Sequence, residues 1–267
     1  MRLKRLFSLF LFFLFAFGMI PAGGPAALAE SGKSLTLMVY MCGSNLESCN
    51  GVATADLLEM AGSGYDFRNV NLLVMAGGTS QWELGLPTDA LCIYRPGRGQ
   101  LVMLSAFEDI SMGEADALTL LLDYGYERFP AQEYALILWD HGGGPLNGVC
   151  WDERYGGDHL TMEELCRALG QSPAAERRLS WIGFDACLMA SAEVGNLMAP
   201  YAKYMIASQE TEPGTGWDYS FLRDIHPETD GAATGRCIVD SYFGGTDDQA
   251  GLTLSVTDLD MLPDLTA

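Results

Sequence analysis

Two short apolar runs, each closed by a polar turn, constrain the possible folds of this chain most strongly. The first covers 134–139 and leads into a glycine-rich turn that begins with His141, and the second covers 180–184 and is followed closely by Cys187. Runs of this length that end in polar or glycine turns are typical of buried strands. If the two strands lie parallel, their C-terminal ends bring His141 and Cys187 into the crevice where open α/β sheets carry their active sites. A thiol beside an imidazole is the minimum apparatus of a cysteine hydrolase.

Strand and helix signals alternate along the rest of the chain. This alternation predicts an α/β fold with a mainly parallel sheet flanked by helices on both faces. The helix expected from Thr161 begins with a capping box, because Glu164 stands three residues later. Strands are expected over 35–42, 70–76, 90–95, 100–105, 134–139, 180–184, 204–208 and 252–256, and helices over 46–61, 114–129, 161–169, 187–198 and 232–243.

The N-terminus has the pattern of an export signal. Basic residues precede the apolar run 6–20, and a stretch of small residues follows and ends at Ala29. We therefore predict a signal peptide over 1–29, a single domain over 30–267, and a secreted or otherwise extracytoplasmic mature protein. An uncleaved anchor is the alternative, although the run is short of the about 20 residues that a spanning helix needs. The chain stops soon after its last predicted strand. A domain truncated at its C-terminus is therefore one interpretation of the sequence.

Charge and cysteine content narrow the function classes. The formal net charge of −20, from 15 basic and 35 acidic residues, argues against nucleic acid as a partner and against stable association with an anionic membrane after signal removal. It would favour cationic substrates, although solubility outside the cell explains most of it. Seven cysteines leave at least one thiol unpaired in an exported protein. Cys42 and Cys49 are close enough in the sequence to pair, but nothing requires it.

The residues around the two strand ends suggest specific roles. We expect Cys187 to open the helix 187–198, whose N-terminus would favour the thiolate. His141 is the candidate acid/base, because imidazole titrates near neutral pH. The N–H groups of Gly142, Gly143 and Cys187 are candidate oxyanion donors. Taken singly, the cysteine has the ordinary interpretation of a core residue, and the His-Gly-Gly-Gly stretch that of a plain turn.

A rival use of a His-Gly-Gly-Gly stretch is the oxyanion hole of α/β-hydrolase esterases. Those enzymes also require a serine in a Gly-x-Ser-x-Gly nucleophile elbow. The glycine clusters at 62–64 and 214–216 do not fit that pattern. The esterase interpretation therefore lacks its nucleophile.

The same residues resemble a known family, the clostripain-like cysteine peptidases (family C11, clan CD), which share the caspase and gingipain fold. The resemblance extends over nearly all of the chain after the signal. It implies a dyad of His141 and Cys187 that cleaves peptide bonds through a thioester, with a peptide or protein as the substrate. The blocks that carry it are 38–46, 137–144, 148–152, 183–189 and 212–217.

The resemblance also implies how the substrate is selected. In this family the acidic residue two positions before the nucleophile lines the S1 pocket, and here it is Asp185, which would pair with Arg or Lys at P1. Some members have a second S1 acid in a later loop, where Glu210, Glu212 and Asp218 are the candidates. Some members depend on calcium. This sequence has no EF-hand-type loop, so no cofactor or metal site is predicted and calcium dependence stays open.

Maturation by self-cleavage is the last implication. The segment 146–158 is polar and glycine-rich in its second half, and we expect an exposed loop there. Its single basic residue is Arg154, which suits a pocket that selects cations, and family members are often matured in this region. We predict cleavage after Arg154, with an ordinary surface arginine as the alternative. A catalytically inert relative that binds peptides or partners is the main alternative to the peptidase itself.

Overall fold

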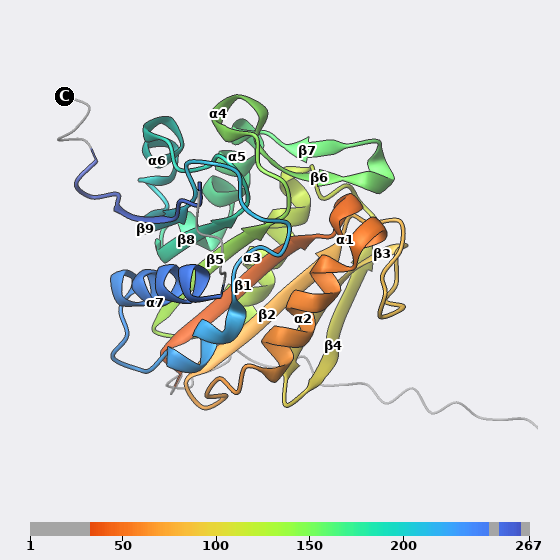
Figure 1. The fold of residues 1–267 in the computed structure, drawn as a ribbon, viewed down its shortest axis with the longest axis horizontal. Helices are drawn as coiled ribbons and strands as arrows, with labels where there is room; N and C mark the ends of the chain where they lie inside the picture. Colours follow the sequence, from red (N-terminus) through yellow and green to blue (C-terminus); the bar gives the residue numbers. More distant parts are fainter. Residues whose placement is uncertain (1–32, 246–250, 263–267) are drawn as a thin grey trace, which may run out of the picture. The chain divides into compact units, whose positions relative to one another are not determined.

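The computed structural model describes residues 33–245 and 251–262, and within them a mixed sheet carries helices on both sides (Figure 1). The predicted signal peptide, 1–29, lies outside the described residues. The strands are β1 Leu35–Cys42, β2 Val70–Gly77, β3 Ala90–Gly97, β4 Gln100–Glu108, β5 Glu133–Trp139, β6 Val149–Asp152, β7 Asp158–Leu160, β8 Leu179–Asp185, β9 Ala202–Ala207 and β10 Ser255–Asp258. The helices are α1 Ser44–Asn50, α2 Val52–Gly62, α3 Ala115–Arg128, α4 Gly144–Asn147, α5 Met162–Gln171, α6 Ala192–Met198 and α7 Gly231–Gly244, with short 3₁₀ turns η1 Glu153–Tyr155, η2 Pro173–Ala175 and η3 Tyr219–Asp224.

The described part of the main sheet has eight strands in the order β10-β9-β8-β5-β1-β2-β3-β4. Its five central strands, β9, β8, β5, β1 and β2, run parallel. The antiparallel strands β10, β3 and β4 occupy the two sides. The predicted fold class, a mainly parallel sheet flanked by helices, is confirmed. Strands β6 and β7 form a separate antiparallel hairpin.

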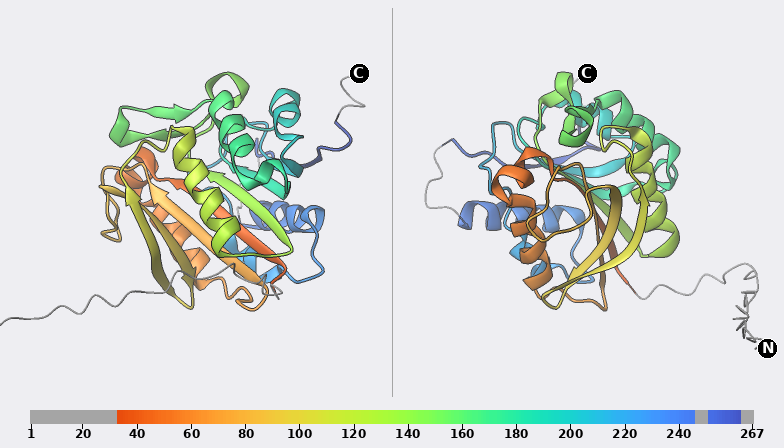
Figure 2. Two further views of the ribbon diagram at one scale, coloured as in Figure 1. Left: turned by 180° about the vertical axis from the view of Figure 1, so that it is seen from behind. Right: turned by 90° about the vertical axis from the view of Figure 1, so that its right-hand side faces the viewer.

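The sheet lies between helices on its two faces (Figure 2). Apolar side chains alternate across it and fill two cores, one on each face. In β1, Met38 and Tyr40 face one core, and Val39 and Met41 face the other, as the two-residue period of a strand requires. Helices α3, α5 and α6 cover the first core. Helices α2 and α7 and the turn η3 cover the second. This double covering explains why the central strands are apolar throughout.

Two predicted helices differ from the structure. The helix expected over 46–61 is two helices, because Gly51 between α1 and α2 has a φ of +66°. The helix expected from Cys187 begins only at Ala192, after Ser191 caps it by accepting the N–H of Val194. The capping box of α5, by contrast, is present as predicted.

Two further observations bear on the environment of the protein. Within 33–245 and 251–262, every helix is too short or too polar to cross a bilayer. All seven cysteines are free thiols in the structure. Cys42 is buried and Cys49 is exposed, so this pair is not joined.

Candidate active site

The pairing of β5 with β8 brings the two predicted loops together. Trp139 at the end of β5 lies opposite Asp185 at the end of β8, and the N–H of Asp140 donates to the Asp185 carbonyl over 3.3 Å. A Cβ added to Gly142 would overlap the backbone carbonyl of Cys187. Glycine is therefore the residue that lets the histidine loop pass directly against the cysteine loop.

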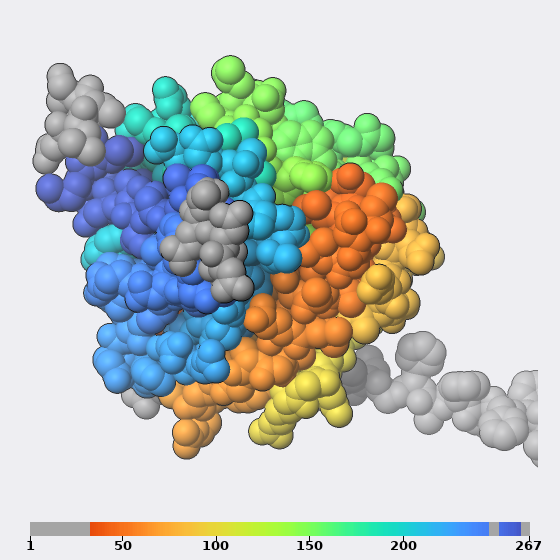
Figure 3. All heavy atoms as spheres, in the orientation of Figure 1, coloured from red at the N-terminus to blue at the C-terminus, as the bar shows by residue number. Residues whose placement is uncertain are grey.

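His141 and Cys187 line one pocket of about 210 Å³. Leu46 of α1 and the loop from Glu212 to Gly216 complete its wall. Figure 3 shows this light-blue chain after β9 lying against the orange helices α1 and α2. The predicted convergence of the thiol and the imidazole at the C-terminal ends of neighbouring parallel strands is thus present in the structure.

Cys187 lies in a loop, not at a helix start. The predicted stabilisation of its thiolate by a helix N-terminus is therefore wrong, since α6 begins five residues later. The next residue, Leu188, has a φ of +69°, a conformation that side chains adopt rarely and that often marks functional turns. The half-buried Sγ accepts a hydrogen bond from the N–H of Glu212 over 3.2 Å. The loop after β9 therefore orients the thiol.

His141 is half-buried, and this burial lowers the pKa of its imidazole. Its Nε2 lies 2.7 Å from Oδ1 of Asn45, the second residue of α1. The ring also meets the edge of Trp151, with 6.4 Å between ring centroids. Sequence reasoning gave Asn45 no role, because it stands 96 residues before the histidine it contacts.

The three predicted oxyanion donors differ in whether their N–H groups already donate a hydrogen bond within the protein. The N–H of Gly143 donates to the carbonyl of Gly148 over 2.9 Å, so the structure corrects the role predicted for it. The N–H groups of Gly142 and Cys187 have no acceptor among the residues that the structure describes. These two remain free to face a substrate oxygen.

Asp185 forms a buried carboxylate in the pocket wall, with only 4% of its surface exposed. It accepts hydrogen bonds from the N–H of Trp217, over 3.2 Å, and from the hydroxyl of Tyr219, over 2.8 Å. Burial nevertheless raises the pKa of Asp185 to about 7. None of the ion pairs in the described part of the chain involves it.

Glu212 is the second acidic residue of this pocket. Its Oε1 accepts the indole N–H of Trp217 over 3.3 Å, and its buried Oε2 has no hydrogen-bond partner in the described structure. Burial, and then the nearby charge of Asp185, raise the pKa of Glu212 well above its usual value. Of the other two candidates, Glu210 is exposed, and Asp218 caps η3 and lines a neighbouring pocket.

Arg154 lies at the tip of the β6–β7 hairpin, within η1. The open loop expected over 146–158 is therefore wrong in its first half, where the chain forms α4 and β6. The guanidinium pairs with Asp109 over 2.5 Å, and about a quarter of the side chain, 26%, is exposed. Because the hairpin tip is exposed, the scissile bond predicted after Arg154 lies at the surface.

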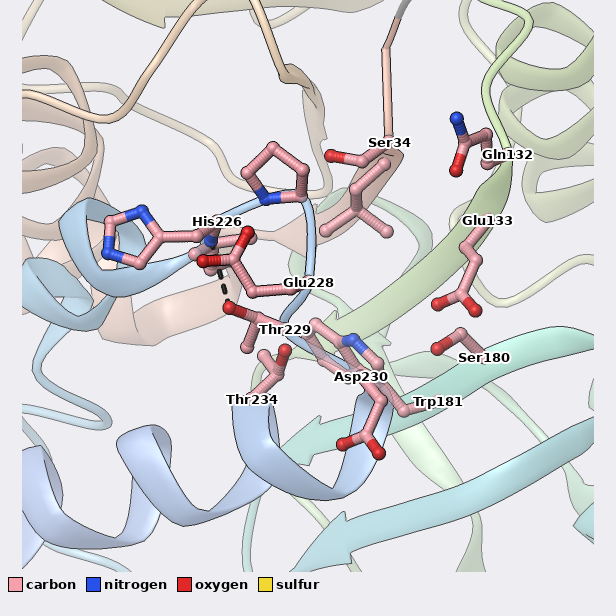
Figure 4. A pocket seen from close by; sticks show the side chains of 13 residues that line it. Ser34, Gln132, Glu133, Ser180, Trp181, His226, Glu228, Thr229, Asp230 and Thr234 are labelled. Atoms are coloured by element: carbon pink, nitrogen blue, oxygen red, sulfur yellow. Dashed lines mark hydrogen bonds between the residues drawn. The ribbon is translucent and has the colours of Figure 1, made fainter.

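Neither of the other two histidines lines the pocket of Cys187, although His159 lines a neighbouring pocket together with His141. His159 stacks on Trp151, with 4.9 Å between ring centroids. His226 lies at the opposite ends of the strands, beside a pocket of about 220 Å³ that Glu133, Glu228 and other polar residues line (Figure 4). No cysteine lines that pocket. In the described part of the chain, no three His, Cys, Asp or Glu side chains gather as ligands for a metal ion.

Comparison with known proteins agrees with this arrangement. The model of the clostripain family matches residues 39–267. The chain belongs to the clostripain family. It is 26% identical over 229 residues to clostripain of Hathewaya histolytica, an alignment that covers 73% of this chain and 42% of that protein. The aligned part of this chain therefore spans less than half the length of that clostripain.

Two solved structures share the fold of this chain. A secreted C11 cysteine protease from Bacteroides thetaiotaomicron, in complex with an irreversible peptide inhibitor, superposes with a TM-score of 0.70 at 22% identity, covering 87% of this chain and 68% of that one. An inactive zymogen C11 protease from Parabacteroides distasonis gives 0.68 at 23% identity, covering 88% and 64%.

Proposed function

We propose that this clostripain-family chain is an exported cysteine endopeptidase that cleaves after arginine or lysine. One observation carries the proposal: the pocket that holds His141 and Cys187 also holds two buried carboxyl groups, Asp185 and Glu212, with no cationic partner in the described structure. A buried carboxylate without a countercharge is costly. The side chain of a basic P1 residue would supply that charge. The N-terminal sequence pattern supports export.

In the mechanism we propose, the Cys187 thiol passes its proton to His141, and the resulting thiolate attacks the scissile carbonyl carbon and forms a tetrahedral intermediate. The N–H groups of Gly142 and Cys187 stabilise its oxyanion, an effect worth about 3–4 kcal/mol per donor in well-studied cases. His141 gives a proton to the leaving amine, and the C–N bond breaks to leave a thioester. A water molecule, deprotonated by His141, then attacks the thioester, which releases the acid product and restores the thiol.

A fluorogenic peptide panel tests this proposal. The purified protein is incubated with substrates that differ only at P1, with Arg, Lys, citrulline, Ala or Asp, and each is repeated after treatment with a thiol alkylator. We expect hydrolysis of the Arg and Lys substrates alone, and its loss on alkylation. Preference for Asp or Ala would show that the S1 assignment is wrong. Peptide binding without any turnover would favour an inert relative.

Ionisation of Asp185 should give the P1 preference a pH dependence. Because the raised pKa of Asp185 is about 7, the carboxyl is neutral below that pH and charged above it. The ratio of kcat/KM for P1 arginine to kcat/KM for P1 citrulline should therefore rise with pH through about 7. The ratio cancels the titration of the thiol and the imidazole, which both substrates share.

Asp185→Asn is the matched variant for this prediction. It should weaken the rise of the ratio through about pH 7, leaving only the titration of Glu212, and should lower the ratio by at least about 30-fold, since loss of one partner of a buried charge pair costs about 2–5 kcal/mol. Glu210→Gln, an exposed carboxylate outside the pocket, should keep both the ratio and its pH dependence. A ratio that is flat with pH in the unmodified protein would remove Asp185 from substrate selection.

We further propose that the protein matures by cutting its own chain after Arg154. The hairpin tip is exposed, and release of the guanidinium from Asp109 would let it enter an acidic pocket. The expected products are a light chain with His141 and a heavy chain with Cys187, held together by the pairing of β5 with β8.

Denaturing gels distinguish this maturation from chance proteolysis. The unmodified protein should run as two bands, and Cys187→Ala and Arg154→Ala as one. Arg98→Ala is the control, because Arg98 also lies at an exposed hairpin tip, between β3 and β4, and should not alter the pattern. A fully active single chain after long incubation would contradict obligatory processing.

A further inference from the structure

The contact between Asn45 and His141 defines the state of the imidazole. Oδ1 of Asn45 lies 2.7 Å from Nε2 of His141. A carbonyl oxygen can only accept a hydrogen bond, so Nε2 carries the hydrogen whenever this bond forms. In the neutral ring the other nitrogen, Nδ1, then has no hydrogen. The amide thus selects one of the two tautomers.

The position of Asn45 is itself fixed by buried contacts. The preceding residue, Ser44, has a φ of +47°, and its hydroxyl donates to Oδ1 of Asp140 over 2.5 Å. The other oxygen of Asp140 accepts the N–H of Trp151 over 2.6 Å. Asp140 directly precedes His141 in the chain. One buried carboxyl therefore ties the start of α1, which carries the amide, to the loop that carries the imidazole.

A neutral amide differs from a carboxylate in this position. It orients the ring without adding a negative charge that would stabilise the imidazolium, and burial alone then lowers the pKa of His141. The nearest carboxyl in the chain, Asp140, is buried and directs both oxygens to other donors. His141 can thus remain neutral near neutral pH with its tautomer still defined.

We infer that Asn45 is a positioning residue that holds His141 as the Nε2–H tautomer, so that Nδ1 is the atom that takes up and delivers the proton in peptide cleavage. The inference about cleavage rests on the proposed function, whereas the tautomer is a property of the resting protein. The chain offers a matched control in Asn147. It lines, with Asn45 and His141, a neighbouring pocket that does not include Cys187, and its Cβ, which alanine retains, is the atom that a Cβ added at Gly143 would meet first.

The tautomer can be measured without any turnover. Two-bond ¹⁵N–¹H correlation spectra of protein labelled at histidine, prepared as Cys187→Ala so that it cannot cut itself, give distinct ring-nitrogen shifts for each tautomer. We expect Nε2–H for His141 in this background and after Asn147→Ala. Asn45→Ala should give a mixture of tautomers. Asn45→Asp still accepts a hydrogen bond and should restore Nε2–H in spectra recorded at a pH high enough to keep the ring neutral, since its carboxylate raises the pKa of the imidazole. Finding Nδ1–H in the Cys187→Ala protein, or no change on Asn45→Ala, would overturn the inference.

Kinetics in the active background test the consequence. Asn45→Ala should lower kcat for a P1 arginine amide about 10- to 100-fold, the usual effect of removing the group that orients a histidine, with KM nearly unchanged. Asn147→Ala should stay within about twofold of the unmodified enzyme. Equal loss in both asparagine variants would reduce Asn45 to a structural residue. If the unmodified protein cleaves nothing, the proposed function fails while the spectra still decide the tautomer.

Discussion

Replacement of Cys187 by alanine is expected to abolish peptidase activity and leave the fold intact. The thiol is the only nucleophile in the mechanism we propose, so no acyl intermediate can form without it. In the folded protein its Sγ accepts a hydrogen bond from the N–H of Glu212, donates a long, weak one to the carbonyl of the same residue, and is only half-buried. Its removal should cost about 1 kcal/mol, which is small against the about 5–15 kcal/mol that stabilises a typical domain.

The measurement is hydrolysis of a P1 arginine peptide, with thermal unfolding recorded on the same samples. Cys166→Ala is the matched control, since Cys166 is also half-buried but lies in α5, outside the pocket. It should keep full activity. Brief alkylation followed by mass spectrometry should find that activity is lost in proportion to labelling of Cys187. Activity that survives in a folded Cys187→Ala protein would require another nucleophile.

The meeting of His141 and Cys187 was predictable because it depends on strand order alone. Each residue directly follows an apolar run, and parallel strands that lie next to each other end at the same edge of the sheet. The pairing of Trp139 with Asp185 is the register that this requires. The sequence predicts a role for Gly142 as a backbone donor to the substrate, whereas its close approach to the Cys187 backbone is seen only in the structure.

The local structure around Cys187 was not predictable in the same way. The apolar spacing after it is helical, but Leu188 adopts a positive φ and Ser191 supplies the cap, so α6 starts late. Only the contact of this loop with the chain after β9, such as the bond from the Leu188 N–H to the Glu210 carbonyl, accounts for the turn. Such a contact leaves no periodic signal in the sequence.

The roles of Asn45 and Glu212 depend on contacts between distant segments. Asn45 reaches His141 from a separate helix, and Glu212 is brought beside Asp185 because Trp217 holds both carboxyl groups. By sequence alone, three acidic residues are equal candidates for the second position in the pocket: Glu210, Glu212 and Asp218. The three candidates differ in how deeply each carboxyl group is buried and in whether it points into the pocket. Neither property can be predicted from residue type or spacing.

Replacement of His141 by alanine is expected to lower kcat for amide substrates about 10²–10⁴-fold, the usual contribution of a general acid/base. An amine is a poor leaving group unless it is protonated as the C–N bond breaks, and His141 is the histidine that lines the pocket with Cys187. An activated ester with the same P1 arginine has a leaving group that departs without a proton. Its acylation rate should therefore fall much less than amide hydrolysis.

The contrast between the two leaving groups separates loss of proton transfer from general damage to the site. A burst experiment with the ester measures acylation directly, and steady-state hydrolysis of the peptide measures the amide reaction. His226→Ala provides the control, because His226 lies at the opposite ends of the strands and lines no part of the Cys187 pocket, so both rates should stay near those of the unmodified enzyme. If His141→Ala slowed ester and amide equally, the residue would act by shaping the pocket. Amide hydrolysis within threefold of the unmodified enzyme would remove His141 from the mechanism.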